Sequence, residues 1–330
     1  MTAERATAVA HPNLALIKYW GKRDEQLVLP WTGSLSLTLD VFPTRTSLTL
    51  DPSLDEDRFL LNGAAVTGTP LDRVRTFLDL VREQSGSRVR ARIESENSVP
   101  TGAGLASSAS GFAALATSAS RAYGLPTDTV SLSRLARRGS GSACRSVIGD
   151  LVEWHAGEGS GEAADAASYA ENIPGPDLAM VIVVVSSAEK AVSSRVAMRE
   201  TIRTSPYFDG WVTGTTQDLI DMRGALAAGD YTRVGELTES NALRMHAAIN
   251  GSRPPVRYLA PTSVEVFDTV ERLRADGLEV YGTADAGPNV AVLCRNADLD
   301  RAHRALAERF PGLDLIPARS GPGAHLVENE

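Results

Sequence analysis

The chain has 330 residues, a formal net charge of −8 at pH 7 and an isoelectric point near 5.3. With 43% hydrophobic and 22% charged residues, it has the composition of an ordinary folded protein, which excludes an intrinsically disordered chain. The acidic balance, without a basic stripe, argues against nucleic acid as a partner. A chain of this length suits two lobes that share a cleft, and an acidic protein that handles anions must gather its cations locally in such a cleft.

The two cysteines, Cys144 and Cys294, show no metal-ligand spacing with histidines. We expect two buried thiols in a reducing compartment, and without geometry a disulfide between them stays open. The first residues lack the basic segment and apolar run of a signal peptide. The longest apolar run, 178–185, is too short to span a bilayer. The sequence therefore predicts a cytoplasmic protein with no membrane partner.

The first half of the chain alternates between strand and helix patterns. Apolar residues alternate with polar ones over 35–41, and again at 48–50 after Pro43, which predicts half-buried strands. Apolar residues at helical spacing predict a helix over 74–81, with Asp72 in its first turn. Further along, the patterns predict a strand over 89–97, a helix over 106–123, a helix over 131–138 and a strand over 150–155.

The second half follows a segment rich in Gly, Ala, Ser and acidic residues, 157–167, which we expect to be a surface loop and the softest boundary between lobes. The continuous β-branched run over 178–185 predicts a strand buried on both faces. This mixture of strands and helices predicts two α+β lobes rather than a doubly wound parallel sheet. The remaining patterns predict helices over 211–228, 231–249, 266–273 and 299–310, strands over 278–283 and 289–294, and short strands near the C-terminus.

The segment 99–109 joins a predicted strand to a predicted helix through small residues. Small residues let backbone N–H groups approach phosphate oxygens, and a helix N-terminus adds partial positive charge there. Ser107 and Ser108 fall in the first turn, where hydroxyls cap the helix, bind phosphate or ligate Mg²⁺. The segment lacks the Lys-Ser/Thr of a Walker P-loop and the glycine spacing of a dinucleotide site. By composition, a plain tight loop and a phosphate site both stay open.

Three cations, Lys18, Lys22 and Arg23, lie within six residues, beside Tyr19 and Trp20. A charge cluster alone is typical of a solvated turn with a half-buried tryptophan. The alternative is an anion pocket, in which the lysines act as point charges and Tyr19 supplies a hydroxyl.

A second polar cluster, 139–146, places Ser140, Ser142 and Arg145 on a turn opened by glycine. Arginine grips a carboxylate through two parallel hydrogen bonds, which lysine cannot do. A capping serine followed by a structural salt bridge explains the same string, so both interpretations stay open. Asp285 precedes a Gly-Pro turn and is typical of an Asx turn; the alternative is a carboxylate that accepts or orients a hydroxyl proton.

Five motifs, in order and over nearly the whole chain, resemble those of the mevalonate diphosphate decarboxylases in the GHMP kinase superfamily. The phosphate loop matches the superfamily signature Pro-x-x-x-Gly-Leu-x-Ser-Ser-Ala from Pro100 to Ala109. A family helix is also matched by Asn241, Arg244 and His246, of which we expect His246 to pack beside the cleft. The matching motifs lie within 13–23, 100–109, 139–146, 192–195 and 285–289.

The resemblance implies the two-lobed GHMP kinase fold, with an ATP-binding lobe over 1–180, a ferredoxin-like lobe over 181–330 and a deep cleft between them. It implies ATP-dependent decarboxylation of mevalonate 5-diphosphate through phosphorylation of its 3-hydroxyl, giving isopentenyl diphosphate, ADP, phosphate and CO₂. It further implies ATP and Mg²⁺ as cofactors, and a homodimer.

The roles of the family's residues carry over position by position. Arg145 is expected to hold the substrate carboxylate and Asp285 to direct the 3-hydroxyl toward the γ-phosphate. Lys18 and Asn13 complete the expected catalytic set. The expected substrate contacts are Tyr19, Lys22, Ser140, Ser142, Arg145, Ser194 and Arg195; the expected ATP contacts are Pro100, Thr101, Gly102, Ala103, Gly104, Leu105, Ala106, Ser107 and Ser108; and the expected metal ligands are Ser107 and Asp285.

Lys190, just before the Val-Ser-Ser-Arg motif, is either a solvated lysine or a cation that reaches ATP when the site closes. Three places depart from the family pattern: Trp31 and Gly33 stand where a Ser or Thr pair is usual, Ala284 replaces a common Met, and 149–151 reads Gly-Asp-Leu rather than Gly-Gly-Phe. These departures leave the substrate open between the diphosphate, a monophosphate and another phosphorylated 3-hydroxy acid.

Two other classes of protein also stay open. One is a GHMP small-molecule kinase that stops at phosphorylation, against which Arg145 argues, because a substrate carboxylate explains it. The other is a ligand sensor on an inactive kinase fold, against which the intact catalytic set argues.

Overall fold

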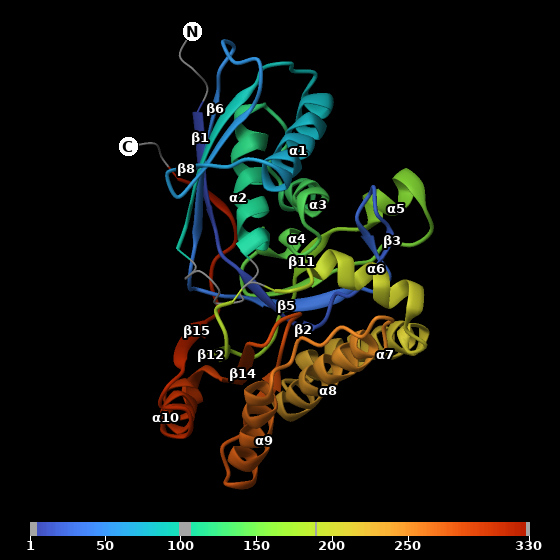
Figure 1. Cartoon of the computed structure of the whole chain (residues 1–330), viewed down its shortest axis with the longest axis vertical. Coiled ribbons are helices and arrows are strands. Elements are labelled where there is room, and N and C mark those ends of the chain that lie inside the picture. Colours follow the sequence, from blue (N-terminus) through green and yellow to red (C-terminus); the bar gives the residue numbers. More distant parts are fainter. Residues whose placement is uncertain (1–4, 99–106, 189, 328–330) are drawn as a thin grey trace.

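The computed structural model describes residues 5–98, 107–188 and 190–327. Sheets and helices stack in layers along the long axis of the molecule (Figure 1). Among the described residues, one strand pair is parallel, β7 (Arg58–Leu61) with β9 (Ala91–Asn97), and all other pairs are antiparallel. This confirms the α+β prediction over a doubly wound parallel sheet.

The first sheet has six strands and carries helices on one face (Figure 1). Its edge pairs the two ends of the described chain, because β1 (Arg5–Ala10) lies beside β16 (His325–Val327). The helices are α1 (Thr69–Ser85), α2 (Ser107–Ala122) and α3 (Thr129–Gly139). The many alanines of α2 let its backbone approach β1 and β6 closely, and Ala113 and Ala116 are fully buried there. The remaining strands of this sheet are β6 (Thr44–Leu50) and β8 (Ala64–Ala65).

The second sheet has four strands and positions the site. In β2 (Asn13–Ile17), alternation sends Leu14 and Leu16 into the core against α7 (Phe208–Ala228) and α8 (Tyr231–Asn250), and turns Asn13 and Ala15 the other way. The neighbouring β5 (Ser34–Thr38) repeats the pattern, with leucines toward the same core and serines opposite. Polar side chains are thereby held inside the molecule on a rigid sheet. The other strands are β10 (Leu151–Trp154) and β11 (Ala170–Asn172).

The third sheet is built around β12 (Leu178–Val184), which pairs with β14 (Val290–Arg295) on one side and β15 (Asp314–Arg319) on the other. Its residues alternate between a core that includes α8 and a core that includes α9 (Pro261–Ala275) and α10 (Leu299–Arg309). The predicted strand buried on both faces is therefore confirmed. The fourth strand of this sheet is β13 (Tyr281–Thr283).

Three segments differ from the sequence-based expectation. The strand expected to be half-buried over 35–41 is β5, whose residues are all buried, because its leucines pack against α7 and α8 while its serines hold the buried Arg145. The expected surface loop 157–167 contains a helix, α5 (Gly161–Ala167), because its alanines favour a helix and Ala164 is buried. A second unexpected helix, α6 (Ser194–Thr204), begins where the Ser193 hydroxyl accepts a hydrogen bond from the Val196 N–H group. The short remaining elements are β3 (Lys22–Asp24), β4 (Leu29–Pro30), α4 (Ala143–Ser146) and the 3₁₀ turn Asn296–Asp298.

Both cysteines are buried free thiols, as expected from the sequence. In the part of the chain that the structure describes, no helix combines the length and apolar character needed to cross a membrane.

A buried ion pair beneath the first sheet yields a stability prediction. Asp57 accepts two hydrogen bonds from Arg82, at 3.0 and 2.9 Å, and one from the Ala91 N–H group at 2.9 Å. Asp57→Ala leaves the buried Arg82 guanidinium with only the exposed Asp79 as an anionic partner and leaves the Ala91 N–H group without its acceptor. We therefore expect the free energy of unfolding to fall by about 3 kcal/mol. Urea unfolding followed by circular dichroism measures this. Asp55→Ala, on the exposed loop two residues away, is the matched control, and equal losses in the two variants would contradict the prediction.

Candidate active site

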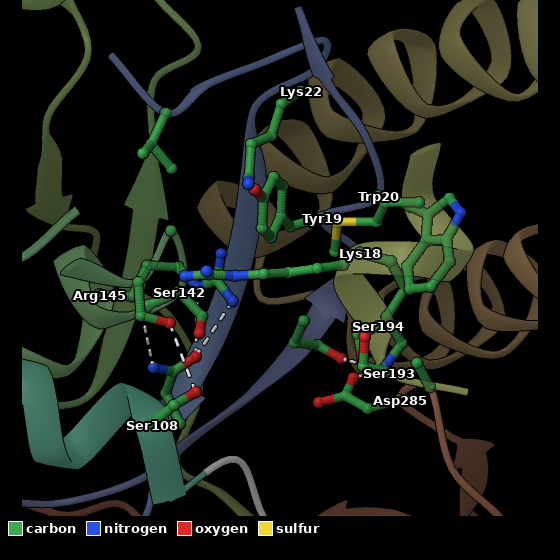
Figure 2. Close-up of a pocket in the computed structure, with 18 of the residues that line it drawn as sticks. Lys18, Tyr19, Trp20, Lys22, Ser108, Ser142, Arg145, Ser193, Ser194 and Asp285 are labelled. Atoms are coloured by element: carbon green, nitrogen blue, oxygen red, sulfur yellow. Dashed lines mark hydrogen bonds and ion pairs between the residues drawn. The ribbon is translucent and has the colours of Figure 1, made fainter. Parts of the chain in front are cut away.

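A cavity of about 300 Å³ lies between the second sheet, α1, α3, α4, α6 and the turn that carries Asp285 (Figure 2). Six of the described lining residues are cationic, and Asp285 is the one carboxylate among them. A net positive cavity in a protein of charge −8 meets the expectation of locally gathered cations. Ten residues predicted from the sequence to be catalytic or substrate-binding all line it: Asn13, Lys18, Tyr19, Lys22, Ser140, Ser142, Arg145, Ser194, Arg195 and Asp285.

Arg145, on α4, is only 2% exposed and is held by neutral oxygens. Its guanidinium donates to the Asn13 side chain, at 3.3 and 3.1 Å, and to Ser36 and Ser34, at 2.9 and 2.5 Å. Within the described residues, no carboxylate forms an ion pair with it. These bonds leave one hydrogen on each terminal nitrogen for a ligand. Burial lowers the pKa of Arg145 from its ordinary value, so an anion is the favourable partner.

Asn13 connects this arginine to the serine cluster. Its amide nitrogen donates to the Ser142 carbonyl oxygen at 3.0 Å and to the Ser146 hydroxyl at 2.8 Å, while its amide oxygen faces Arg145. Its orientation is therefore fixed at both ends, and it positions the guanidinium.

Lys18 and Asp285 form an ion pair of 2.7 Å at another wall of the cavity. The Lys18 ammonium is 1% exposed and also donates to the Ala15 carbonyl at 2.7 Å, whereas the Asp285 side chain is 39% exposed and open to a ligand. The backbone N–H group of Lys18 donates a hydrogen bond to the side-chain oxygen of Asn241, at 2.8 Å. Asn241 lies on α8, so helix packing places the lysine.

Opposing effects set the charge of this pair. Burial would raise the pKa of Asp285, but Lys18, then Arg145 and Lys190, outweigh burial and hold that pKa below its ordinary value. Burial lowers the pKa of Lys18 despite the opposing charge of Asp285. Asp285 is thus an anion at neutral pH, kept so by a buried cation.

A second group of cations lies away from Asp285. Lys22 is on the opposite side of the view from Asp285 in Figure 2, and its ammonium pairs with Glu25 at 2.8 Å. Glu25 in turn accepts a hydrogen bond from Arg199 on α6, at 3.2 Å. Arg195 donates to the Gly139 carbonyl at 3.5 Å, next to Ser140. The structure therefore separates one cationic end, around Lys22 and Arg195, from the end that holds Asp285.

Tyr19 lies within the cavity wall between these groups. Its ring packs edge-on against Trp154, with 4.8 Å between ring centroids, and among the described residues its buried hydroxyl has no hydrogen-bond partner. A Cβ at Gly141 would lie 2.8 Å from that hydroxyl, so only glycine fits there. Burial raises the pKa of Tyr19, which keeps the hydroxyl protonated and able to donate to a ligand.

Much of the predicted ATP loop, Pro100 to Ala106, lies outside the described residues, as does the side chain of Ser107, a predicted metal ligand. Ser108 is described, lines the cavity, and its hydroxyl lies 3.4 Å from that of Ser140. The described start of α2, which follows the predicted phosphate loop in sequence, thus lies at the same cavity. Among the described residues there is no group of three or more His, Cys, Asp or Glu that could hold a metal ion.

Lys190 is exposed and lines the cavity, so its charge is available to a ligand there. His246 is buried on α8, where Nε2 lies 3.3 Å from the Ala284 carbonyl oxygen, and burial lowers its pKa to about 4. As expected from the sequence, His246 is not among the residues that line the cavity. Trp31, Gly33 and Ala284 are not among them either, so these departures leave the described lining unchanged.

Sequence reasoning missed three functional contacts. Ser34 and Ser36, which hold Arg145, were visible as polar residues that alternate with leucines in a buried strand. Arg73, on α1, also lines the cavity, and neither its spacing nor its neighbours mark it in the sequence.

The fold and this cavity define an enzyme of the GHMP kinase class. Residues 10–170 match the diphosphomevalonate decarboxylase-like N-terminal domain, and residues 180–321 match the mevalonate 5-diphosphate decarboxylase C-terminal domain. The diphosphomevalonate decarboxylase of Candida albicans is 37% identical over 92% of this chain and 88% of its own length. The chain belongs to the diphosphomevalonate decarboxylase family.

Two solved structures resemble it closely. One, a complex of MDDEF with MVAPP, AMPPCP and magnesium, is 44% identical, with a TM-score of 0.93 over 99% of this chain and 100% of the other. The other, mevalonate diphosphate decarboxylase from Staphylococcus aureus, is 40% identical, with a TM-score of 0.94 over 99% of each chain. Similarity at this level covers the whole fold rather than one region.

The excess positive charge predicts that a small polyanion stabilises the fold. Inorganic pyrophosphate at ten times its dissociation constant should raise the free energy of unfolding by about 1.4 kcal/mol, because it binds only the folded cavity. Thermal unfolding with and without pyrophosphate, in sodium chloride of matched ionic strength, measures the effect. An equal shift with chloride alone would show that general screening, not the cavity, is responsible.

Proposed function

We propose that this chain decarboxylates mevalonate 5-diphosphate with ATP and releases isopentenyl diphosphate, ADP, phosphate and CO₂. One observation carries the proposal: Arg145, buried without a carboxylate partner among the described residues, faces the same cavity as the Asp285 anion. A kinase whose alcohol substrate carries no carboxylate needs the second group but has no use for the first. The family's names and the solved complex with MVAPP and AMPPCP support the same reaction.

The two charged ends of the cavity set the orientation of the substrate. The diphosphate lies toward Lys22 and Arg195, with the hydroxyls of Ser140, Ser142 and Ser194 beside it. The carboxylate pairs with the two free hydrogens of Arg145, as a planar fork suits a carboxylate. The 3-hydroxyl then lies near Asp285, at the end of the cavity away from Lys22. Binding in one orientation supplies much of the rate by removing the cost of alignment.

Asp285 acts on the 3-hydroxyl. Its carboxylate accepts the hydroxyl proton, or orients that proton, while the oxygen attacks the γ-phosphate. Lys18 keeps Asp285 ionised and fixes one of its oxygens, which leaves the other oxygen for the substrate. Asn13 positions Arg145 and completes the set.

Phosphorylation makes the tertiary oxygen a good leaving group. When it departs, positive charge develops at C3, and the C–C bond to the carboxylate supplies the electron pair for the new double bond as CO₂ leaves. Arg145 orients the carboxylate for this cleavage. The serines and cations at the end around Lys22 and Arg195 hold the diphosphate, which keeps the reacting carbon in position.

ATP and Mg²⁺ serve as cofactors. Mg²⁺ is usually held by one or two carboxylates together with substrate phosphates, so one ionised Asp285 and nearby serine hydroxyls fit it. When bound, the ion neutralises charge on the phosphate oxygens. The ATP phosphates bind the segment predicted for them, 100–108, and the exposed Lys190, which lines the cavity with Ser108, is a cation available to them.

We also propose a division into lobes at about residue 180, a homodimer and a cytoplasmic location. The two domain matches, which end at residue 170 and begin at residue 180, support the division. Two buried free thiols support a reducing compartment. The homodimer is proposed from the family resemblance.

The first test of the mechanism is Asp285→Asn or Arg145→Ala. Each removes a group that acts mainly in the transition state, so we expect kcat to fall by about 100-fold or more while ATP still binds. The assay measures ADP and CO₂ from mevalonate 5-diphosphate in the same reaction. The matched control is Asp268→Asn on the exposed side of α9. If the wild-type enzyme released ADP but no CO₂, it would be a kinase instead. Near-normal turnover by Asp285→Asn would disprove the role of Asp285.

The second test concerns pH. Because Asp285 must be ionised and Lys18 keeps its pKa low, Asp285 does not limit kcat of the native enzyme until the pH approaches the ordinary range of an aspartate or below. In Lys18→Met, burial acts without the opposing cation, so the pKa of Asp285 rises and the acid limb of kcat moves to higher pH. Profiles at saturating substrate measure this, and Lys18→Arg should keep the native limb. If the acid limb of the kcat profile stayed at the native pH in Lys18→Met, the Lys18 ammonium would not control the pKa of Asp285.

A further inference from the structure

Helix α8 contacts the chain on both sides of the ion pair between Lys18 and Asp285. The backbone N–H group of Lys18 donates to the Asn241 side-chain oxygen at 2.8 Å. Five residues along the same helix, Nε2 of the buried His246 lies 3.3 Å from the carbonyl oxygen of Ala284, the residue before Asp285. The side chains of one helix therefore set where the ammonium and the carboxylate meet.

The Asn241 amide serves Lys18 in only one of its two orientations. Its oxygen must face the Lys18 N–H group, so its nitrogen must find acceptors on the other side. That nitrogen donates to the Thr215 hydroxyl at 3.3 Å and to a carboxylate oxygen of Asp218 at 2.8 Å. A hydroxyl can donate or accept and tolerates either orientation, whereas an ionised carboxylate only accepts. Asp218 therefore decides which end of the amide faces Lys18.

Asp218 is itself fixed in place on α7. It is 5% exposed, and one terminal nitrogen of Arg244 on α8 donates to its two oxygens at 2.7 and 2.6 Å. Gly214 leaves room for this arginine, because a Cβ there would lie 3.0 Å from the other terminal nitrogen. Apolar residues of similar volume often hold two helices together as well as a buried ion pair does. Stability alone thus does not explain the carboxylate, whereas the orientation of the amide does.

We propose that Asp218 is a positioning residue for the reaction: through Asn241 it fixes the backbone of Lys18, and with it the contact between the Lys18 ammonium and Asp285. Neither Asp218 nor Asn241 is among the described residues that line the cavity, so both act through Lys18 rather than on a ligand. The effect on turnover rests on the proposed function. The hold on Lys18 does not.

The kinetic test is Asp218→Asn, which keeps the shape of the side chain and can present a nitrogen to Asn241. The Asn241 amide can then turn its own nitrogen toward the Lys18 N–H group, where two donors oppose each other. We expect kcat for CO₂ release to fall by about 10-fold, the size of a typical coupling between contacting residues. KM for ATP and for mevalonate 5-diphosphate should stay within twofold, because the groups that hold them are unchanged. A raised KM with native kcat would overturn the proposal.

A double-mutant cycle tests whether the effect passes through Lys18. Lys18→Met leaves no ammonium to position, so adding Asp218→Asn to it should change kcat by less than twofold. A further loss of about 10-fold in the double variant would overturn the proposal.

Asp221→Asn is the matched control. Asp221 lies three residues along α7 and pairs with Arg233 of α8 at 3.0 Å, so its variant removes the same charge from the same pair of helices. It should keep kcat within twofold of native. Equal losses in Asp218→Asn and Asp221→Asn would assign the effect to a looser contact between α7 and α8 and overturn the proposal.

Chemical labelling follows the hold on Lys18 without any substrate. The chain contains three lysines, Lys18, Lys22 and Lys190; the Lys18 side chain is 1% exposed, whereas Lys190 is exposed. Reductive methylation read by peptide mass spectrometry should modify Lys18 at least about 5-fold faster in Asp218→Asn than in the native protein, with Lys190 as the internal reference. An unchanged rate in the folded variant would overturn the proposal.

If circular dichroism shows that Asp218→Asn does not fold, Asn241→Ala takes its place, because it removes the amide and leaves the pair of Asp218 and Arg244 intact. The same fall in kcat and the same faster labelling of Lys18 are expected, and native values of both would overturn the proposal. If the native enzyme releases no CO₂ from mevalonate 5-diphosphate, the proposed function fails, while the labelling still decides whether Asp218 holds Lys18.

Discussion

A buried guanidinium whose hydrogen-bond partners, within the described part of the chain, are all neutral is the constraint that organises this molecule. Arg145 could have been paired with a protein carboxylate, which would have relieved its burial and closed it to a substrate. Instead, Asn13, Ser34 and Ser36 satisfy its hydrogen bonds without neutralising its charge. Those oxygens must come from the interior face of a sheet, and the alternation of β2 and β5 provides them. The leucines on the opposite face pack against α7 and α8, so the same two strands secure the core and keep the charge unneutralised.

Asp285 follows the opposite rule. Asp285 stays ionised in a partly enclosed position because it forms an ion pair with Lys18, whose side chain is buried more deeply than that of Asp285. Lys18 cannot turn away to solvent, since its ammonium is held by the Ala15 carbonyl and its backbone by Asn241. The cation therefore tunes Asp285 without competing for the substrate. The cavity thus holds one anion that is paired, Asp285, and one cation without a charged partner among the described residues, Arg145. This asymmetry favours one orientation for a ligand that carries both a carboxylate and a hydroxyl group.

How much of this the sequence revealed depended on the kind of pattern. Long periodic segments, such as those that became β12, α7 and α8, were predicted because period and burial agree within one element. The α5 helix was missed because seven residues with one buried alanine show little periodicity. Ten of the residues that line the cavity were named from motifs, whereas the approach of Arg73 to Arg195 depends on two helices about 120 positions apart in sequence. Such a contact is decided by tertiary packing, and no local pattern records it.

The net charge of the protein and the charge of the cavity have opposite signs. A protein of net charge −8 repels a substrate that carries a diphosphate and a carboxylate over most of its surface. Six cations around one cavity reverse the field locally, and enclosure by a low-dielectric wall strengthens it there. Those cations also repel one another, and Arg73 and Arg195 share one acceptor, the Gly139 carbonyl oxygen. A bound polyanion offsets this repulsion, and the affinity expected of the site for polyanions follows from that arrangement of charge.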